Sequence, residues 1–126
     1  MSKEVLLIES DTKLAAIYKE FLEKEGYSVR TAADAQEAIH SVDEHHPDVV
    51  ILEVQLPDHN GVEFLYELRS YADWHNLPVI IHSMIPVERF KVAEENWRDY
   101  GVHAYLYKPT SKLTDISKAI QEVIGQ

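Results

Sequence analysis

The strongest constraint on the fold is a set of short apolar runs in which hydrophobic residues follow one another with no polar residue between them. Such runs occur at residues 5–8 (VLLI), 49–52 (VVIL) and 79–81 (VII). A strand with one face in water alternates apolar and polar residues, whereas a strand covered on both faces does not. The runs therefore predict buried strands in a parallel sheet with helices on both faces.

Segments with helical periodicity separate these runs. The first has apolar residues at positions i, i+3, i+4, i+7 and i+8, namely Leu14, Ile17, Tyr18, Phe21 and Leu22. This spacing predicts one buried helix face. Asp11 or Ser10 is placed to cap the start of the helix, and Gly26 to end it.

Strand and helix alternate five times along the chain. We expect strands at residues 5–8, 27–31, 49–54, 78–83 and 103–107, and helices at 14–25, 35–46, 62–71, 87–100 and 113–124, with a turn at 57–61. Such alternation predicts an α/β fold with right-handed crossovers. We predict a doubly wound (βα)5, flavodoxin-like domain spanning residues 1–126, with a parallel sheet in the strand order 2-1-3-4-5.

Composition excludes several functions. The chain has 22 acidic and 12 basic residues, a formal net charge of -10, and no cysteine. An excess of acids opposes binding to nucleic acid, and the absence of cysteine removes disulfides and thiolate metal sites. No apolar run approaches the roughly 20 residues that span a bilayer. We expect a cytoplasmic protein that contacts neither nucleic acid nor membrane.

Polar residues follow the predicted strands at their carboxyl ends. They are Glu9, Ser10, Glu53, Ser83 and Lys108. In an open parallel sheet these strand ends form one rim, and ligands bind there. The rim is therefore the predicted functional site.

In this order the residues resemble the receiver domain of bacterial response regulators (the CheY-like family), across essentially the whole chain. The family has an acidic pair after strand one, a phosphorylated Asp after strand three, Thr or Ser after strand four, and Lys-Pro after strand five. The matching positions here are Glu9 with Ser10, Glu53, Ser83, and Lys108 with Pro109. Leu56-Pro57 and Gly61 also match, and Tyr105 occupies the place of the aromatic switch residue.

Two departures from the family pattern predict a pseudo-receiver. Glu53 carries one methylene more than Asp, which displaces the carboxylate in a site that tolerates roughly 0.5 Å. Ser10 puts a neutral hydroxyl where the resemblance implies a Mg²⁺ ligand, and Mg²⁺ prefers hard anionic oxygens. We therefore expect a degenerate metal site (Glu9, Ser10, Glu53 and Gln55) with weak or no Mg²⁺ binding and no other cofactor. Met84, where the family has a small residue, is placed to cover the rim.

The leading hypothesis is a two-component signalling module that is not an enzyme and acts by protein–protein contact. Its partner would be a histidine kinase, an output domain or another signalling protein of a phosphorelay. The contact face would comprise segments 87–100, 103–107 and 113–124, with Ser83, Trp97, Tyr105 and Lys108 as switch or interaction residues. Lys108 is expected to pair with Glu53, and Ser83 to hydrogen-bond it, so that Glu53 imitates part of a phosphorylated Asp.

Several other interpretations remain open. Glu53 is either a residual phosphoryl acceptor or a carboxylate that Lys108 neutralises for stability alone. A one-residue shift would bring Asp11 to the metal, although a helix cap suits it better. A flavodoxin-like cofactor binder needs a phosphate-cradling loop, and residues 10–14 contain no glycine. For His82, a core position is favoured over a catalytic role. The aromatic residues near Trp97 are equally consistent with a hydrophobic core and with a binding patch.

Overall fold

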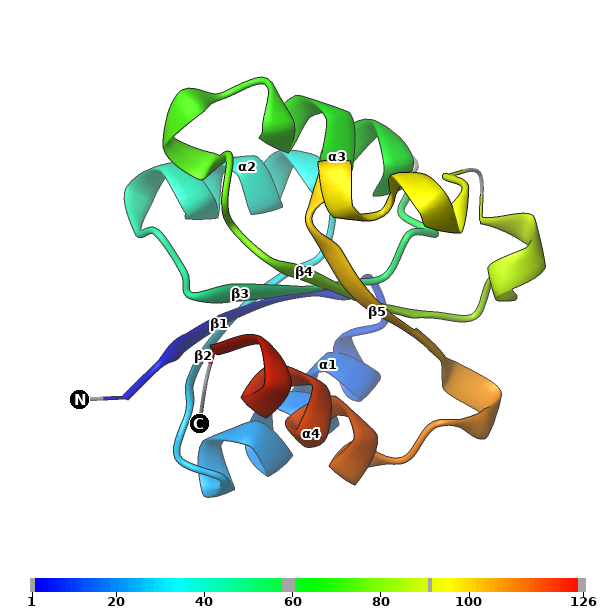
Figure 1. The fold of residues 1–126 in the computed structure, drawn as a ribbon. Helices are drawn as coiled ribbons and strands as arrows, with labels where there is room; N and C mark the ends of the chain where they lie inside the picture. Colours follow the sequence, from blue (N-terminus) through cyan, green and yellow to red (C-terminus); the bar gives the residue numbers. More distant parts are fainter. Residues whose placement is uncertain (1, 58–60, 91, 125–126) are drawn as a thin grey trace.

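The computed structural model describes residues 2–57, 61–90 and 92–124. Its five strands form one parallel sheet in the order β2-β1-β3-β4-β5 (Figure 1). The strands are β1 (Glu4–Ile8), β2 (Ser28–Ala32), β3 (Val49–Leu52), β4 (Val79–Ser83) and β5 (Val102–Tyr107). The predicted fold class and strand order are confirmed.

Four α-helices cover the sheet in two layers. They are α1 (Thr12–Lys24), α2 (Ala35–Glu44), α3 (Gly61–Arg69) and α4 (Leu113–Ile124). Figure 1 shows α2 and α3 on one face of the sheet, and α1 and α4 on the other. None of these helices is long and apolar enough to cross a membrane.

The helix α1 begins and ends where its sequence predicts. The Asp11 side chain accepts hydrogen bonds from the backbone N–H groups of Lys13 and Leu14, so Asp11, and not Ser10, is the N-cap. Gly26 follows the helix with a φ of 101°, a conformation that favours glycine. One detail of the predicted face is wrong, because Ile17 is 50% exposed.

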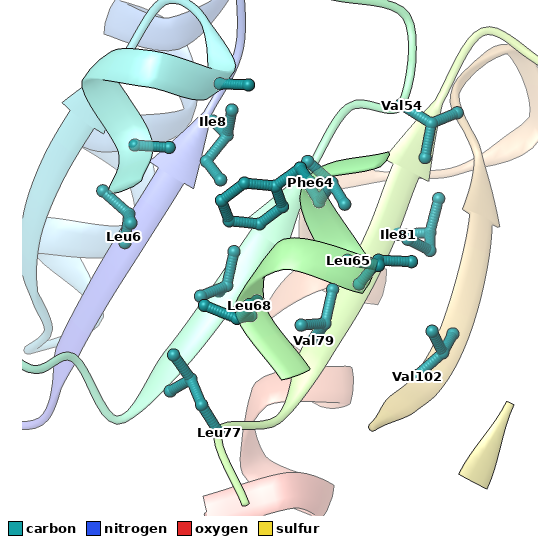
Figure 2. Packing of buried hydrophobic residues seen from close by; sticks show 14 of the residues in the cluster. Leu6, Ile8, Val54, Phe64, Leu65, Leu68, Leu77, Val79, Ile81 and Val102 are labelled. Atoms are coloured by element: carbon teal, nitrogen blue, oxygen red, sulfur yellow. The ribbon is translucent and has the colours of Figure 1, made fainter. Parts of the chain in front are cut away.

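The strand runs pack against helices on both sides. Leu6 and Ile8 of β1 lie in the cluster that also contains Phe64 of α3 (Figure 2), whereas Val5 and Leu7 lie in the cluster beneath α1 and α4. Successive side chains of a strand point to opposite faces. The absence of alternation in these runs therefore reflects burial on both faces, as predicted.

The predicted helix at residues 87–100 is wrong. The structure has three short 3-10 helices there, η2 (Val87–Arg89), η3 (Glu94–Asn96) and η4 (Arg98–Tyr100), and Lys91 lies outside the described residues. Ala93 is extended, with a φ of -61° and a ψ of 143°, which ends any helix before it. The Trp97 indole N–H donates to the Val92 carbonyl at 3.0 Å, a contact that takes the place of a helical turn.

The third helix ends earlier than predicted. The helix α3 ends at Arg69, and a 3-10 helix, η1 (Ala72–Trp74), takes over from the predicted last turn. The predicted turn at 57–61 falls mostly on residues 58–60, which lie outside the described residues.

Candidate functional site

The rim of the sheet brings together the charged residues that the sequence places at the strand ends. Lys108 Nζ donates to Glu53 Oε1 at 2.7 Å and also to Glu9 Oε1. Glu9 follows β1, Glu53 follows β3, and Lys108 opens the short 3-10 helix η5 (Lys108–Thr110) after β5. The side chains of Glu9 and Glu53 are 4% exposed and that of Lys108 is 7% exposed. We call these three residues the rim triad.

The Glu53 carboxylate receives hydrogen bonds on both oxygens. Oε1 accepts from Lys108 Nζ and from the Met84 backbone N–H at 3.2 Å. Oε2 accepts from the Ser83 hydroxyl and from the Gln55 backbone N–H at 3.0 Å. The predicted contacts of Glu53 with Lys108 and Ser83 are therefore present. The two backbone donors could not be predicted from the sequence, because a backbone N–H carries no side-chain signal.

Contacts at the rim set the protonation states of Glu53 and Lys108. Burial alone would raise the pKa of Glu53, but hydrogen bonds from Lys108, Ser83 and the Gln55 N–H hold it below its ordinary value. Burial likewise acts to lower the pKa of Lys108, yet its bonds to Glu53 and Glu9 raise it above the ordinary value. Both Glu53 and Lys108 therefore stay ionised at neutral pH.

The rim residues are poorly suited to Mg²⁺, the metal ion that the resemblance implies. Glu9 Oε2 accepts the Asp11 backbone N–H at 3.1 Å, so every oxygen of the two triad carboxylates has a donor. Ser10 offers only a neutral hydroxyl. Across the described ranges, no group of three or more His, Asp or Glu side chains could hold a metal ion. With Lys108 bound to both carboxylates and only a neutral hydroxyl at Ser10, this arrangement fits Mg²⁺ poorly, because Mg²⁺ prefers several anionic oxygens.

The positions of Asp11 and Met84 do not favour the roles considered for them, which were metal binding for Asp11 and covering of the rim for Met84. The Asp11 carboxylate is exposed and is engaged as the cap of α1. The Met84 side chain is 51% exposed, so it extends into solvent, and its contribution to the rim is its backbone N–H. Gln55, the remaining residue of the predicted metal set, is also exposed.

A chain of hydrogen bonds leads from Glu53 to the aromatic switch position. The Ser83 hydroxyl donates to Glu53 and accepts the Ile85 backbone N–H at 3.0 Å. The Ile85 carbonyl in turn accepts the Tyr105 hydroxyl. Glu53 is thus connected to Tyr105 through the Ser83 hydroxyl and the backbone of Ile85.

Tyr105 belongs to a cluster of three aromatic rings. Its ring lies 5.1 Å from that of Phe90 and 6.1 Å from that of Trp97, with which it stacks at 22°. Phe90 is buried, whereas Trp97 and Tyr105 are half-buried. The cluster therefore forms part of the core and also reaches the surface. Burial raises the pKa of Tyr105 to about 12, so its hydroxyl remains a donor.

Two buried residues beside the rim triad were not predicted to form part of the site. His82 is 4% exposed, as a core position requires, and its ring meets that of Tyr18 edge-on at 5.0 Å. Burial, and then the charge of Lys108, lower the pKa of His82 to about 4. The histidine is therefore neutral at pH 7. Helical periodicity identifies Tyr18 only as a core residue.

A parallel sheet in the order 2-1-3-4-5, with acids after β1 and β3 and a lysine after β5, defines a receiver-like protein. The chain belongs to the response regulator receiver domain family, whose model matches residues 5–121. Receiver domains are components of two-component signalling.

Individual relatives agree with this assignment. The chain is 30% identical, over 111 residues, to the polar-differentiation response regulator DivK of Brucella ovis, with 88% of each chain covered. A CheY-like receiver domain protein from Methanospirillum hungatei JF-1 is 25% identical and has a TM-score of 0.83, covering 99% of this chain and 95% of its own. A sensor protein from Polaromonas sp. JS666 shares the fold, with a TM-score of 0.86 at 22% identity and coverage of 98% and 96%.

Proposed function

We propose that this chain is a pseudo-receiver, a receiver domain that is not phosphorylated in the usual way and acts through protein–protein contact. The observation that carries the proposal is the Glu53 carboxylate, whose two oxygens accept four hydrogen bonds. A phosphoryl acceptor needs a carboxylate oxygen that can attack in line. An oxygen held by several donors is a weaker nucleophile and is poorly placed to move.

The rim lacks a second requirement of phosphoryl transfer. A metal ion normally neutralises the charge on the transferred oxygens. Here the only cation among the rim residues is Lys108, whose ammonium is already shared by Glu9 and Glu53. We therefore expect Mg²⁺ to bind weakly or not at all.

Glu53 supplies a fixed charge in place of a transient one. Its contacts with Ser83 and Lys108 imitate those of a phosphorylated Asp, with about one charge instead of the -1.5 to -2 of a phosphoryl group. The hydrogen bonds through Ser83 and Ile85 extend this state to Tyr105. The module would then be held in one signalling state and be regulated by the availability of its partner.

The proposed contact face includes β5 and α4 beside the half-buried rings of Trp97 and Tyr105. Half-exposed aromatic rings are enriched in protein interfaces. The partner would be a histidine kinase, an output domain or another signalling protein in the cytoplasm.

Intact-mass measurement tests the proposal. Incubation with Mg²⁺ and acetyl phosphate should leave the mass of the protein unchanged. The matched control is the Ser10→Asp/Glu53→Asp double variant, which restores both family residues and should gain one phosphoryl group in a Mg²⁺-dependent manner. A phosphoryl group on Glu53 of the unaltered protein would overturn the proposal. A double variant that stays unmodified would contradict the claim that these two residues disable the site.

A further inference from the structure

A groove separates α2 from the corner where α3 meets η1, on the layer shown above the sheet in Figure 1. Its volume is about 790 Å³, and it shares no lining residue with the rim triad. The residues that characterise it are Ile39, Asp43, Glu67, Tyr71, Asp73 and Trp74. We call it the α2–α3 groove.

Two aromatic residues give the groove an apolar surface. The rings of Tyr71 and Trp74 lie 4.6 Å apart and are tilted by 55°. Trp74 is 7% exposed, while Tyr71 is 44% exposed and is one of the exposed large hydrophobic residues in the described part of the chain. Tyr71 thus presents an aromatic ring to whatever enters the groove.

Three carboxylates from three elements surround this aromatic surface. They belong to Asp43 of α2, Glu67 of α3 and Asp73 of η1. Within residues 2–57, 61–90 and 92–124, none of these carboxylates forms an ion pair or accepts a hydrogen bond. Among the described residues that line the groove there is no lysine or arginine, and the one histidine, His40, pairs with Glu44 at 3.7 Å.

The charge of the surrounding layer differs from that of the opposite layer. Over their described bounds, α2, α3 and η1 carry six acids and a single base, Arg69. The Arg69 guanidinium is turned inward, onto the carbonyls of Tyr100, Trp74, His75 and Leu77. The helices α1 and α4 carry four acids and four bases. Among the α-helices and η1, the excess of negative charge therefore lies on the layer that contains the groove.

We propose that the α2–α3 groove is a docking site for an arginine-bearing segment of a partner protein. A guanidinium can stack on the exposed Tyr71 ring and at the same time donate paired hydrogen bonds to neighbouring carboxylates. A second copy of this chain is disfavoured, because a symmetric contact would set two equally acidic faces against each other. The inference does not depend on the state of the rim triad.

A fluorophore-labelled arginine–serine repeat peptide serves as the probe, with its lysine–serine and glutamate–serine analogues for comparison. Fluorescence anisotropy at low salt gives the affinity of the full chain, and amide shifts in NMR spectra locate the binding site. The arginine peptide should bind more tightly than the lysine peptide, and the glutamate peptide should not bind. Shifts should fall on α2, α3 and η1.

Two triple variants distinguish binding in the α2–α3 groove from nonspecific attraction between the basic peptide and an acidic protein. Each variant changes the net charge by the same amount. Asp43→Asn/Glu67→Gln/Asp73→Asn should weaken binding of the arginine peptide by at least about tenfold. The control Glu20→Gln/Glu23→Gln/Glu122→Gln alters exposed residues of the opposite layer and should weaken binding by no more than about twofold. Tyr71→Leu should remove the preference for arginine over lysine. Equal losses in the two triple variants, or shifts centred elsewhere, would overturn the proposal.

Discussion

At the scale of single residues, Lys108 is the counter-ion of two buried carboxylates. Its ammonium contacts both Glu9 and Glu53, and all three side chains are less than a tenth exposed. Removing one member of a buried ion pair leaves an uncompensated charge, which costs far more than the pair itself gains. The stability of the rim therefore depends on the lysine more than on either acid.

Lys108→Met should lower the free energy of unfolding by about 3–5 kcal/mol at pH 7, measured by urea denaturation. The depressed pKa of Glu53 contributes stability above its unfolded value of about 4.3, and this is lost as pH falls through the folded pKa. The loss of unfolding free energy caused by Lys108→Met should therefore be smaller in acid than at pH 7. Lys118→Met, on the exposed side of α4, is the control and should change stability by less than about 0.5 kcal/mol.

His82 should make the protein sensitive to mild acid. The pKa of His82 is about 4 in the folded protein and about 6.5 in the unfolded chain. The contribution of neutral His82 to the unfolding free energy is therefore complete above pH 6.5 and is lost as pH falls toward 4. Tyr18, Lys108 and Glu53 are the titratable groups that face it. Unfolding free energy should fall by about 2–3 kcal/mol over this range, and His82→Phe should flatten the profile. The same change at exposed His103 should leave the profile unaltered; a flat wild-type profile would refute the prediction.

At the scale of elements, Arg69 ties three segments together. Its guanidinium donates to the carbonyl of Tyr100 at 2.9 Å and of Trp74 at 2.5 Å, and also to that of Leu77. Burial lowers the pKa of Arg69, which has backbone carbonyls as its partners instead of an acid. The arginine thereby joins the end of α3 to the residues that precede β4 and β5.

Gly101→Ala should show how firmly this arginine is held. Gly101 has a φ of 69°, and an added Cβ would lie 2.1 Å from the Arg69 guanidinium and 3.2 Å from the Leu77 carbonyl oxygen. We expect a loss of about 2–4 kcal/mol in unfolding free energy. Gly26→Ala, also at positive φ but facing open space, should cost about 1–2 kcal/mol. Equal losses would mean that Arg69 moves aside freely.

The elements also show what the sequence can and cannot predict. The runs at 5–8 and 49–52 have one physical explanation, burial on both faces, and they became β1 and β3. The segment 87–100 has helical spacing, yet ring packing among Phe90, Trp97 and Tyr105 decides its path. The Lys108–Glu53 contact follows from strand order, whereas the Met84 N–H donor and the sharing of Lys108 with Glu9 depend on local geometry.

At the scale of the whole molecule, charge is divided unevenly between the two helical layers. The layer of α2, α3 and η1 has six acids and one base, against equal numbers on α1 and α4. Like charges concentrated on one face repel each other and oppose the compact state. A docking surface kept acidic for a partner therefore lowers the stability of the free protein.

Neutralising the groove should stabilise the protein. Asp43→Asn/Glu67→Gln/Asp73→Asn is expected to raise the unfolding free energy by about 0.5–1 kcal/mol at low salt, and the gain should shrink as salt screens the repulsion. Glu20→Gln/Glu23→Gln/Glu122→Gln, on the balanced layer, should gain less. Urea denaturation at two salt concentrations provides the measurement, and an equal gain in both triple variants would argue against a local effect.

The three 3-10 helices between β4 and β5 affect which proteins can recognise the chain. An α-helix offers partners regular ridges of side chains, into which another helix can pack. The segment from Val87 to Tyr100 has no such ridges over its described residues, and its surface is shaped by the rings of Trp97 and Tyr105. We therefore expect a partner to recognise this segment through the rings of Trp97 and Tyr105, and not by packing a helix against it.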